Sequence, residues 1–139
     1  MAVFSGLSSY FENQVLGKLF GNQTLTVPGT YYIGLWTSPL TNTSTGSSAG
    51  EASGGSYARV AVTNNGSNWD AVSGGATANT NLIAFPMATA SWGTITYVGI
   101  CDASTAGNMI AYAQLNSSVS VSTYDTVLFQ PGDLDITLT

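Results

Sequence analysis

From Gln23 onward the chain is a succession of short runs rich in Val, Ile, Thr, Tyr and Trp, separated by Gly, Ser, Asn and Pro. Runs of this kind are typical of β-strands joined by turns. The 139 residues have the length of a single domain, at about 100–200 residues per domain. About eight such runs follow one another at spacings of roughly 8–12 residues. Residues 24–139 are therefore predicted to form an all-β fold, a single antiparallel β-sandwich or jelly-roll-like domain.

Residues 1–23 have a different pattern and are predicted to form an N-terminal arm and an amphipathic helix. Ser9 and Glu12 have the spacing of a capping box, so one short helix is expected at residues 9–20. Gly21 is the expected left-handed residue after it, and Lys18 lies in the last turn, where the helix dipole favours a cation. The apolar residues of this helix fall on one stripe: Phe11, Val15, Leu16, Leu19 and Phe20.

The composition excludes several classes of protein. Charged residues make up 6% of the chain, with Lys18 and Arg59 as the two cations and a net charge of −5. Nucleic-acid binding is not expected, because it requires clustered Lys and Arg. No apolar run reaches the roughly 18 residues of a membrane span. The chain has no His, which removes a His-based catalytic triad and the commonest zinc ligand.

The carboxylates are the remaining candidates for chemistry. Asp133 and Asp135 would project from the same face of a strand about 6–7 Å apart, a separation that suits a hydrolase pair, although a solvated strand face is the favoured interpretation. Asp102 follows the strongest expected strand, residues 92–101, and could help to hold calcium, but an Asx turn that closes a hairpin is favoured. We therefore expect no catalytic residue, no metal site and no cofactor.

Four other features have two interpretations each. Cys101 continues a strand and is expected to be a small core residue rather than a reactive thiol. The three tryptophans could line a carbohydrate platform, but core positions are favoured. Residues 38–56 are poor in large side chains and are expected to form a long loop that is mobile at its middle. Arg59 is the only arginine and suggests a specific salt bridge or cation–π contact, within the subunit or across a subunit boundary. An ordinary surface position is nearly as well supported.

Four blocks of the sequence resemble a family of small tailed-bacteriophage virion proteins. The most specific are GGSYARVAV at residues 54–62 and ATASWGTI within residues 85–115; YYIGLWTSPL at residues 31–40 and PGDLDITL at residues 131–138 add to them. Such proteins are often labelled tail fibre proteins, and similar small β-sandwich proteins are cement or decoration proteins. The resemblance covers nearly the whole chain. It implies a structural protein of the virion and not an enzyme.

Within that family we expect a capsid cement protein on the outer surface of the head, bound to the major capsid protein and present as a homotrimer. The chain is short and has neither heptads nor repeats that could build a fibre shaft. The alternative is a tail, baseplate or fibre protein that contacts the host surface. The residues expected to make capsid or intersubunit contacts are Phe4, Leu7, Phe11, Val15, Leu16, Leu19, Phe20 and Arg59.

Overall fold

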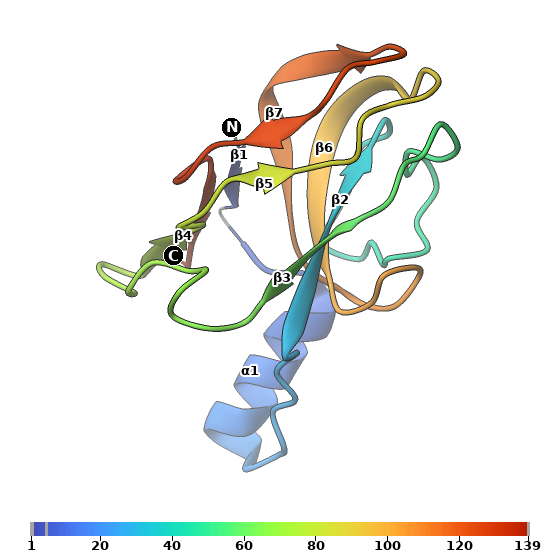
Figure 1. Ribbon diagram of the computed structural model, residues 1–139. Helices are drawn as coiled ribbons and strands as arrows, with labels where there is room; N and C mark the ends of the chain where they lie inside the picture. Colours follow the sequence, from blue (N-terminus) through green and yellow to red (C-terminus); the bar gives the residue numbers. More distant parts are fainter. Residues whose placement is uncertain (1, 5, 139) are drawn as a thin grey trace.

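The computed structural model describes residues 2–4 and 6–138, and these contain nine strands and one helix (Figure 1). In chain order the elements are β1 (Ala2–Phe4), α1 (Ser9–Gly21), β2 (Thr30–Trp36), β3 (Val60–Thr63), β4 (Ala76–Ala78), β5 (Ile83–Ala84), β6 (Gly93–Cys101), β7 (Met109–Val121), β8 (Leu128–Phe129) and β9 (Leu134–Thr137). The prediction of an all-β domain with one short N-terminal helix is confirmed.

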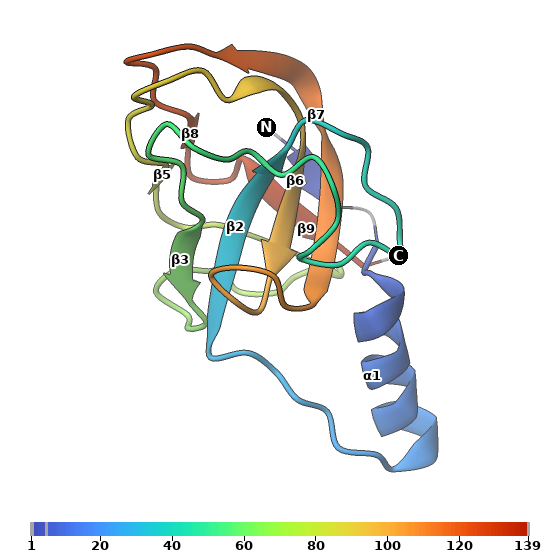
Figure 2. The same cartoon turned by 90° about the vertical axis from the view of Figure 1, so that its right-hand side faces the viewer.

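Seven of the strands form one curled sheet in the order β3-β2-β6-β7-β1-β9-β4, and β5 pairs with β8 in a small second sheet (Figures 1 and 2). The curl gives the domain its sandwich-like form. The ladders are antiparallel with one exception among the described residues: β1 runs parallel to β9. The predicted antiparallel sandwich therefore contains one parallel pair of strands.

The core lies on the concave side of the curled sheet. Alternation along β2 puts Ile33 and Leu35 into it, and Ile95 and Val98 of β6 join them. Apolar side chains on the opposite face of the same strands form a second cluster, of which Trp36 and Cys101 are fully buried members. Because β2 and β6 are covered on both faces where these clusters meet, their sequences run apolar without alternation there.

Strand β1 occupies an inner position in the large sheet, between β7 and β9. Ala2 pairs with both Leu115 and Leu134, and the Phe4 side chain is 0% exposed. The N-terminal segment was expected to be an arm that reaches toward a partner. Its first strand is instead part of the domain's own core, because burial of Phe4 and pairing with β9 along its whole length stabilise it there.

Helix α1 confirms the expected span but not the expected caps. The N-cap is Ser8, whose hydroxyl accepts a hydrogen bond from the Phe11 amide and donates one to the carbonyl of Met109 in β7. The left-handed residue at the other end is Asn22 (φ 51°) instead of Gly21. Each cap lies one residue from its predicted place. At the N-terminal end, Ser8 has an extended backbone that lets its hydroxyl reach both groups. At the other end, the amide of Asn22 donates to the carbonyl of Gly17. Lys18 lies in the last turn, as predicted.

Strands β4 and β5 follow each other closely in the chain but belong to different sheets. Asn79 separates them: its buried side chain donates to the carbonyls of Asn81 and Gln130 and accepts from the Leu134 amide.

Candidate interaction sites

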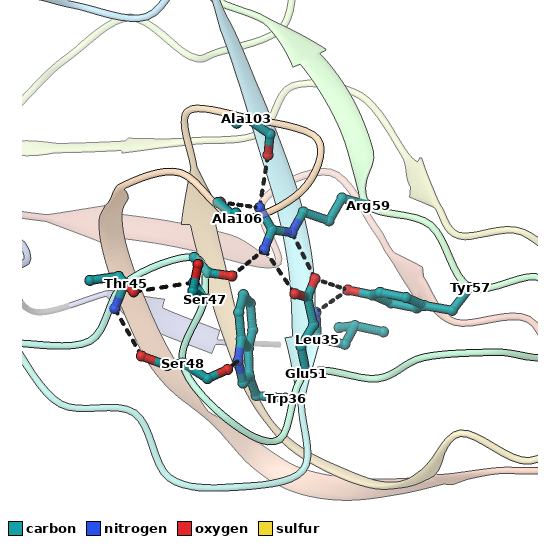
Figure 3. Close-up of polar contacts among 11 residues, drawn as sticks. Leu35, Trp36, Thr45, Ser47, Ser48, Glu51, Tyr57, Arg59, Ala103 and Ala106 are labelled. Carbon is teal, nitrogen blue, oxygen red and sulfur yellow. Dashed lines mark hydrogen bonds and ion pairs between the residues drawn. The ribbon is translucent and has the colours of Figure 1, made fainter.

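Arg59 lies at the centre of a buried polar cluster on one side of the sheet (Figure 3). Its Nε and Nη2 bind the two carboxylate oxygens of Glu51 at 2.7 and 2.8 Å, a bidentate ion pair. Nη1 donates to the carbonyls of Ala103 and Ala106, and Nη2 also donates to the carbonyl of Gly46. All five guanidinium N–H donors therefore have partners within the same chain.

Two aromatic side chains surround this ion pair. The Arg59 guanidinium carbon lies 5.5 Å from the ring centroid of Trp36, a cation–π contact. The Tyr57 hydroxyl donates to Glu51 and accepts from the Leu35 amide, both at 2.9 Å. Burial, together with the nearby Glu51 charge, raises the pKa of Tyr57, so the phenol stays protonated and donates to Glu51. Burial by itself lowers the pKa of Arg59, but its contacts with Glu51 outweigh burial and raise the pKa overall. The cluster therefore contains one buried cation that is neutralised by one carboxylate.

The cluster joins two loops that are distant in sequence. Residues 38–56 were expected to be mobile at their middle, but Gly46 there is buried against the β6–β7 loop. A Cβ atom on Gly46 would lie 1.8 Å from the Ala106 carbonyl oxygen, so this close approach requires glycine. The Trp36 indole also donates to the Ser48 carbonyl. These contacts hold the middle of residues 38–56 in place, so the structure does not support the predicted mobility.

This geometry corrects the expectation that Arg59 contacts a partner. Its side chain is 1% exposed, and its donors are used inside the chain. The expected salt bridge and cation–π contact both exist, with Glu51 and Trp36, and both hold the loops of one subunit together. The sequence contained a signal for the ion pair, since Glu51 is the one acidic residue in the stretch 38–56 and lies eight positions before the only arginine.

Two of the three acidic candidates, Asp102 and Asp133, accept hydrogen bonds within the chain. Asp102 accepts hydrogen bonds from the backbone and side-chain nitrogens of Asn108, so it closes the β6–β7 hairpin as the favoured interpretation had it. Asp133 accepts from the Gln130 amide at the turn before β9. Across residues 2–4 and 6–138, no group of three or more His, Cys, Asp or Glu side chains could hold a metal ion.

The buried aromatic and thiol side chains also belong to the core. Trp36 and Trp92 are buried, which leaves them no exposed face for a carbohydrate platform. Cys101 is fully buried, as predicted, and burial raises the pKa of its thiol to about 12. Within the described part of the chain, no helix is long and apolar enough to cross a membrane.

Helix α1 projects away from the body of the domain, which it joins only at its N-terminal end (Figures 1 and 2). Leu7 and Phe11 at this base are half-buried and pack against the core, and Val15 is half-buried farther along. Beyond them Leu16, Leu19 and Phe20 are 55%, 67% and 85% exposed. We call these three residues the helix tip; their i, i+3, i+4 spacing places them on one face of the helix.

An open apolar cavity of about 450 Å³ lies at the base of the helix. Its walls come from β7, from the helix base and from the segment after β3, where Trp69 meets Tyr31 edge-to-face with ring centroids 5.9 Å apart. Its rim carries Asn65, Asp70 and Val72. No local sequence pattern indicates this cavity, because its walls are distant in sequence: Leu7, Phe11, Tyr31, Trp69, Ile110 and Ile136 are among them.

The described residues form a curled sandwich from which the apolar helix tip projects. Residues 6–137 match the family described as "Podophage GP4 fiber I protein gp80", and the chain belongs to that family. It is a structural protein of a bacteriophage virion. A search of curated proteins found no match.

Proposed function

We propose that the chain is a structural subunit of a podophage fibre that acts through binding contacts and carries no catalytic activity. The family description supports a fibre location over the capsid location expected first. The observation that carries the attachment role is the helix tip, where three large apolar side chains are left in solvent by the chain's own fold. Exposed apolar side chains gathered in one place mark interaction sites.

The base of the helix suits it to act as an attachment element. Ser8 is fully buried and links the first helical turn to β7 through its hydroxyl, while the Ser8 and Ser9 amides donate to the carbonyls of Ile110 and Asn42. The helix is therefore held at a defined angle before any partner binds. A held helix loses less conformational entropy on binding than a flexible arm does.

Many copies in one virion would make weak individual contacts sufficient, because multivalency multiplies them. The tip is apolar and the chain has few charges, so attachment should depend only weakly on salt. Loss of binding between about 50 mM and 1 M salt would contradict an apolar contact.

Co-sedimentation tests the location and the role of the tip together. Purified protein is mixed separately with tails and with heads of a phage that lacks it. Saturable binding to tails or to their fibres supports the proposal. The variant L16S/L19S/F20S should lose binding, and the matched control L82S/M87S/L128S, which removes exposed apolar side chains elsewhere, should keep it. Unchanged binding by the tip variant would refute the attachment role of α1.

Capsid cement remains the second candidate, with the major capsid protein as partner and a homotrimer as the binding form. The observation that favours it is the shape, since a small curled sandwich with one projecting helix can bridge neighbouring capsomers. Saturable binding to heads at a fixed copy number, with none to tails, would establish this role instead. Contact with host glycans is the remaining fibre function, and a glycan array with the purified protein tests it.

Deleting residues 1–23 would not test either role, although it is the natural experiment for an arm. The deletion removes β1 from between β7 and β9 and takes Phe4 out of the core. Loss of binding would then report loss of the fold. Substitutions confined to the exposed tip avoid that ambiguity.

A further inference from the structure

We propose that the cavity at the helix base binds an N-acetylhexosamine unit of a glycan, with the acetamido group inside and the hydroxyl groups at the rim. This inference deepens the glycan contact named above as a fibre function, and it rests on that function in taking a saccharide as the ligand. It does not depend on the helix tip, whose three side chains lie outside the cavity lining. Sugar binding and attachment can therefore fail separately.

The cavity contains the one tryptophan that the core leaves partly exposed. Trp36 and Trp92 are buried, whereas Trp69 is partly exposed and lines the cavity together with Tyr31. The two rings of the cavity meet edge-to-face, so each supports the position of the other. Of the three tryptophans considered for a carbohydrate platform, Trp69 is thus the one that a sugar ring can reach.

The Trp69 indole also has a hydrogen-bond donor that the chain does not use. Its Nε1 atom is buried and finds no acceptor among residues 2–4 and 6–138. Buried donors nearly always have a partner, because an unpaired one destabilises the structure. The ring as a whole is only partly buried, so a turn of the indole can bring its N–H to the cavity. A carbonyl oxygen of the ligand then accepts the hydrogen bond.

The walls of the cavity favour a ligand that carries an apolar group beside that carbonyl. They are mainly aliphatic and aromatic, with Phe11, Ile110 and Ile136 among them. The volume of about 450 Å³ is in the range of small-molecule sites, roughly 300–1,000 Å³. An acetamido group combines one carbonyl acceptor with one methyl group, so it suits both the indole donor and the apolar walls. A plain hexose would place hydroxyl groups against these walls without partners, which is unfavourable.

The rim supplies hydrogen-bonding groups for the sugar hydroxyls. The Asn64 amide nitrogen donates to the Pro28 carbonyl, the Asn65 carbonyl oxygen accepts from two backbone amides, and one Asp70 oxygen accepts from Thr80. Each side chain is thus held by one group, and its second group has no partner among the described residues. The rim therefore presents two acceptors and one donor in fixed positions, which lowers the entropy cost of binding.

The charge of the site favours a neutral sugar. Asp70 is the one charged residue among those that line the cavity, and the chain has a net charge of −5. An acidic sugar would be repelled by this carboxylate. A free amino sugar would be attracted by it but has neither the carbonyl nor the methyl group. A neutral N-acetylhexosamine meets all of these conditions.

Isothermal titration calorimetry of the purified full-length chain with methyl glycosides tests the ligand. The N-acetylglucosamine or N-acetylgalactosamine glycoside should bind saturably, at about millimolar concentration for a single unit. The matched glucose and galactose glycosides lack the acetamido group and should bind roughly 10–200-fold more weakly, the range for one missing apolar group. No saturable binding of either N-acetyl sugar, or equal binding of the plain hexoses, would overturn the inference.

Two variants test whether the sugar lies in this cavity. W69F keeps an aromatic ring but removes the indole N–H, and D70A removes a rim acceptor. Each should weaken binding by about three- to tenfold, the effect of one hydrogen bond. The matched controls are Y124F, an exposed aromatic position, and D125A, an exposed aspartate that also accepts one hydrogen bond. Both controls lie outside the cavity lining and should bind normally.

Tryptophan fluorescence gives a second readout at the same site. The sugar should change the emission of the natural chain, and W69F should lose most of that change, because Trp36 and Trp92 are buried away from the ligand. Circular dichroism checks that each variant is folded. Should W69F fail to fold, D70A still decides, since its side chain is exposed. Unchanged affinity in a folded W69F or in D70A would overturn the inference.

The tip variant L16S/L19S/F20S separates this site from attachment. It should bind N-acetylhexosamine like the natural chain even when it no longer binds tails. A chain that binds tails but no sugar would overturn this inference and leave the attachment role standing. A chain that binds the sugar but no phage part would do the reverse. Co-sedimentation with purified peptidoglycan and, separately, with a surface polysaccharide that contains the sugar shows which source supplies the ligand.

Discussion

In both the Arg59 cluster and the helix tip, the burial of the side chains is the opposite of what their polarity favours. An arginine, which is ordinarily exposed, is buried with every donor used, whereas three large apolar side chains are left in solvent. The buried charge is compensated by Glu51 and backbone carbonyls, so it stabilises the loops of one subunit. The exposed apolar group has no such compensation within the chain. The difference separates a residue that serves folding from residues available for assembly.

The sharpest test of that difference compares two phenylalanines at the two ends of the N-terminal region. Phe4 is 0% exposed and Phe20 is 85% exposed. F4A should lower the free energy of unfolding by about 3–5 kcal/mol, as for other buried Phe to Ala changes. F20A should leave it almost unchanged. Urea denaturation of both variants measures this, and an F4A variant as stable as F20A would show that β1 is not part of the core.

Removal of the buried cation should have the next largest effect. R59M leaves the Glu51 carboxylate without its partner and should cost about 2–4 kcal/mol, somewhat less than a fully buried pair because the Glu51 side chain is 23% exposed. K18M should leave the free energy of unfolding unchanged, because Lys18 is exposed. Chemical denaturation with the two variants side by side gives the comparison. Equal stabilities would mean that the cluster does not hold the loops.

Ser8, which links helix α1 to the body of the domain, should make a smaller contribution to the free energy of unfolding. S8A removes the hydroxyl that caps α1 and binds the Met109 carbonyl, so a loss of about 1–2 kcal/mol is expected. S9A removes the hydroxyl that the sequence pattern identified as the cap, and should change stability little. Far-ultraviolet circular dichroism with thermal unfolding measures both. A larger loss for S9A would reassign the cap to Ser9.

Cys101 should make the free energy of unfolding depend on pH in strong base but not near neutral pH. Its pKa is raised from 9.0 to about 12, because burial disfavours the thiolate. The unfolded chain loses this proton at a lower pH than the folded chain does, so the contribution is fully present below pH 9 and is lost as the pH rises from 9 to 12. C101V should reduce the fall in unfolding free energy over that range. A fall of the same size in C101V would assign it to Tyr57, whose pKa is also raised.

Local sequence patterns predicted the helix and the strands well where the periodicity of a single segment determined its structure. The helix at residues 9–20 and the strand at residues 92–101 were found almost to the residue. The patterns failed where a distant partner decided the outcome. The carbonyl of Met109, about a hundred residues away, helps to place the helix cap at Ser8, and the carbonyl of Gln130 helps to turn the chain at Asn79.

The candidate site shows the same division. Leu16, Leu19 and Phe20 were expected to contact a partner, and the structure leaves their side chains exposed. Phe4 and Arg59 were expected to do the same, but they lie inside the subunit. An apolar stripe or a lone arginine has the same sequence pattern whether it packs inward or outward, because the pattern does not contain the surface that would cover it.

By itself, the sequence determined the all-β class, the position of the one helix and the scarcity of charge. These depend on side-chain periodicity and composition, which are local or additive properties. Only the tertiary structure decided that β1 enters the sheet, that Glu51 neutralises Arg59 and that a cavity opens at the base of α1. Each of these joins segments that are distant along the chain, and the free energy of such contacts depends on geometry that exists only after the chain has folded.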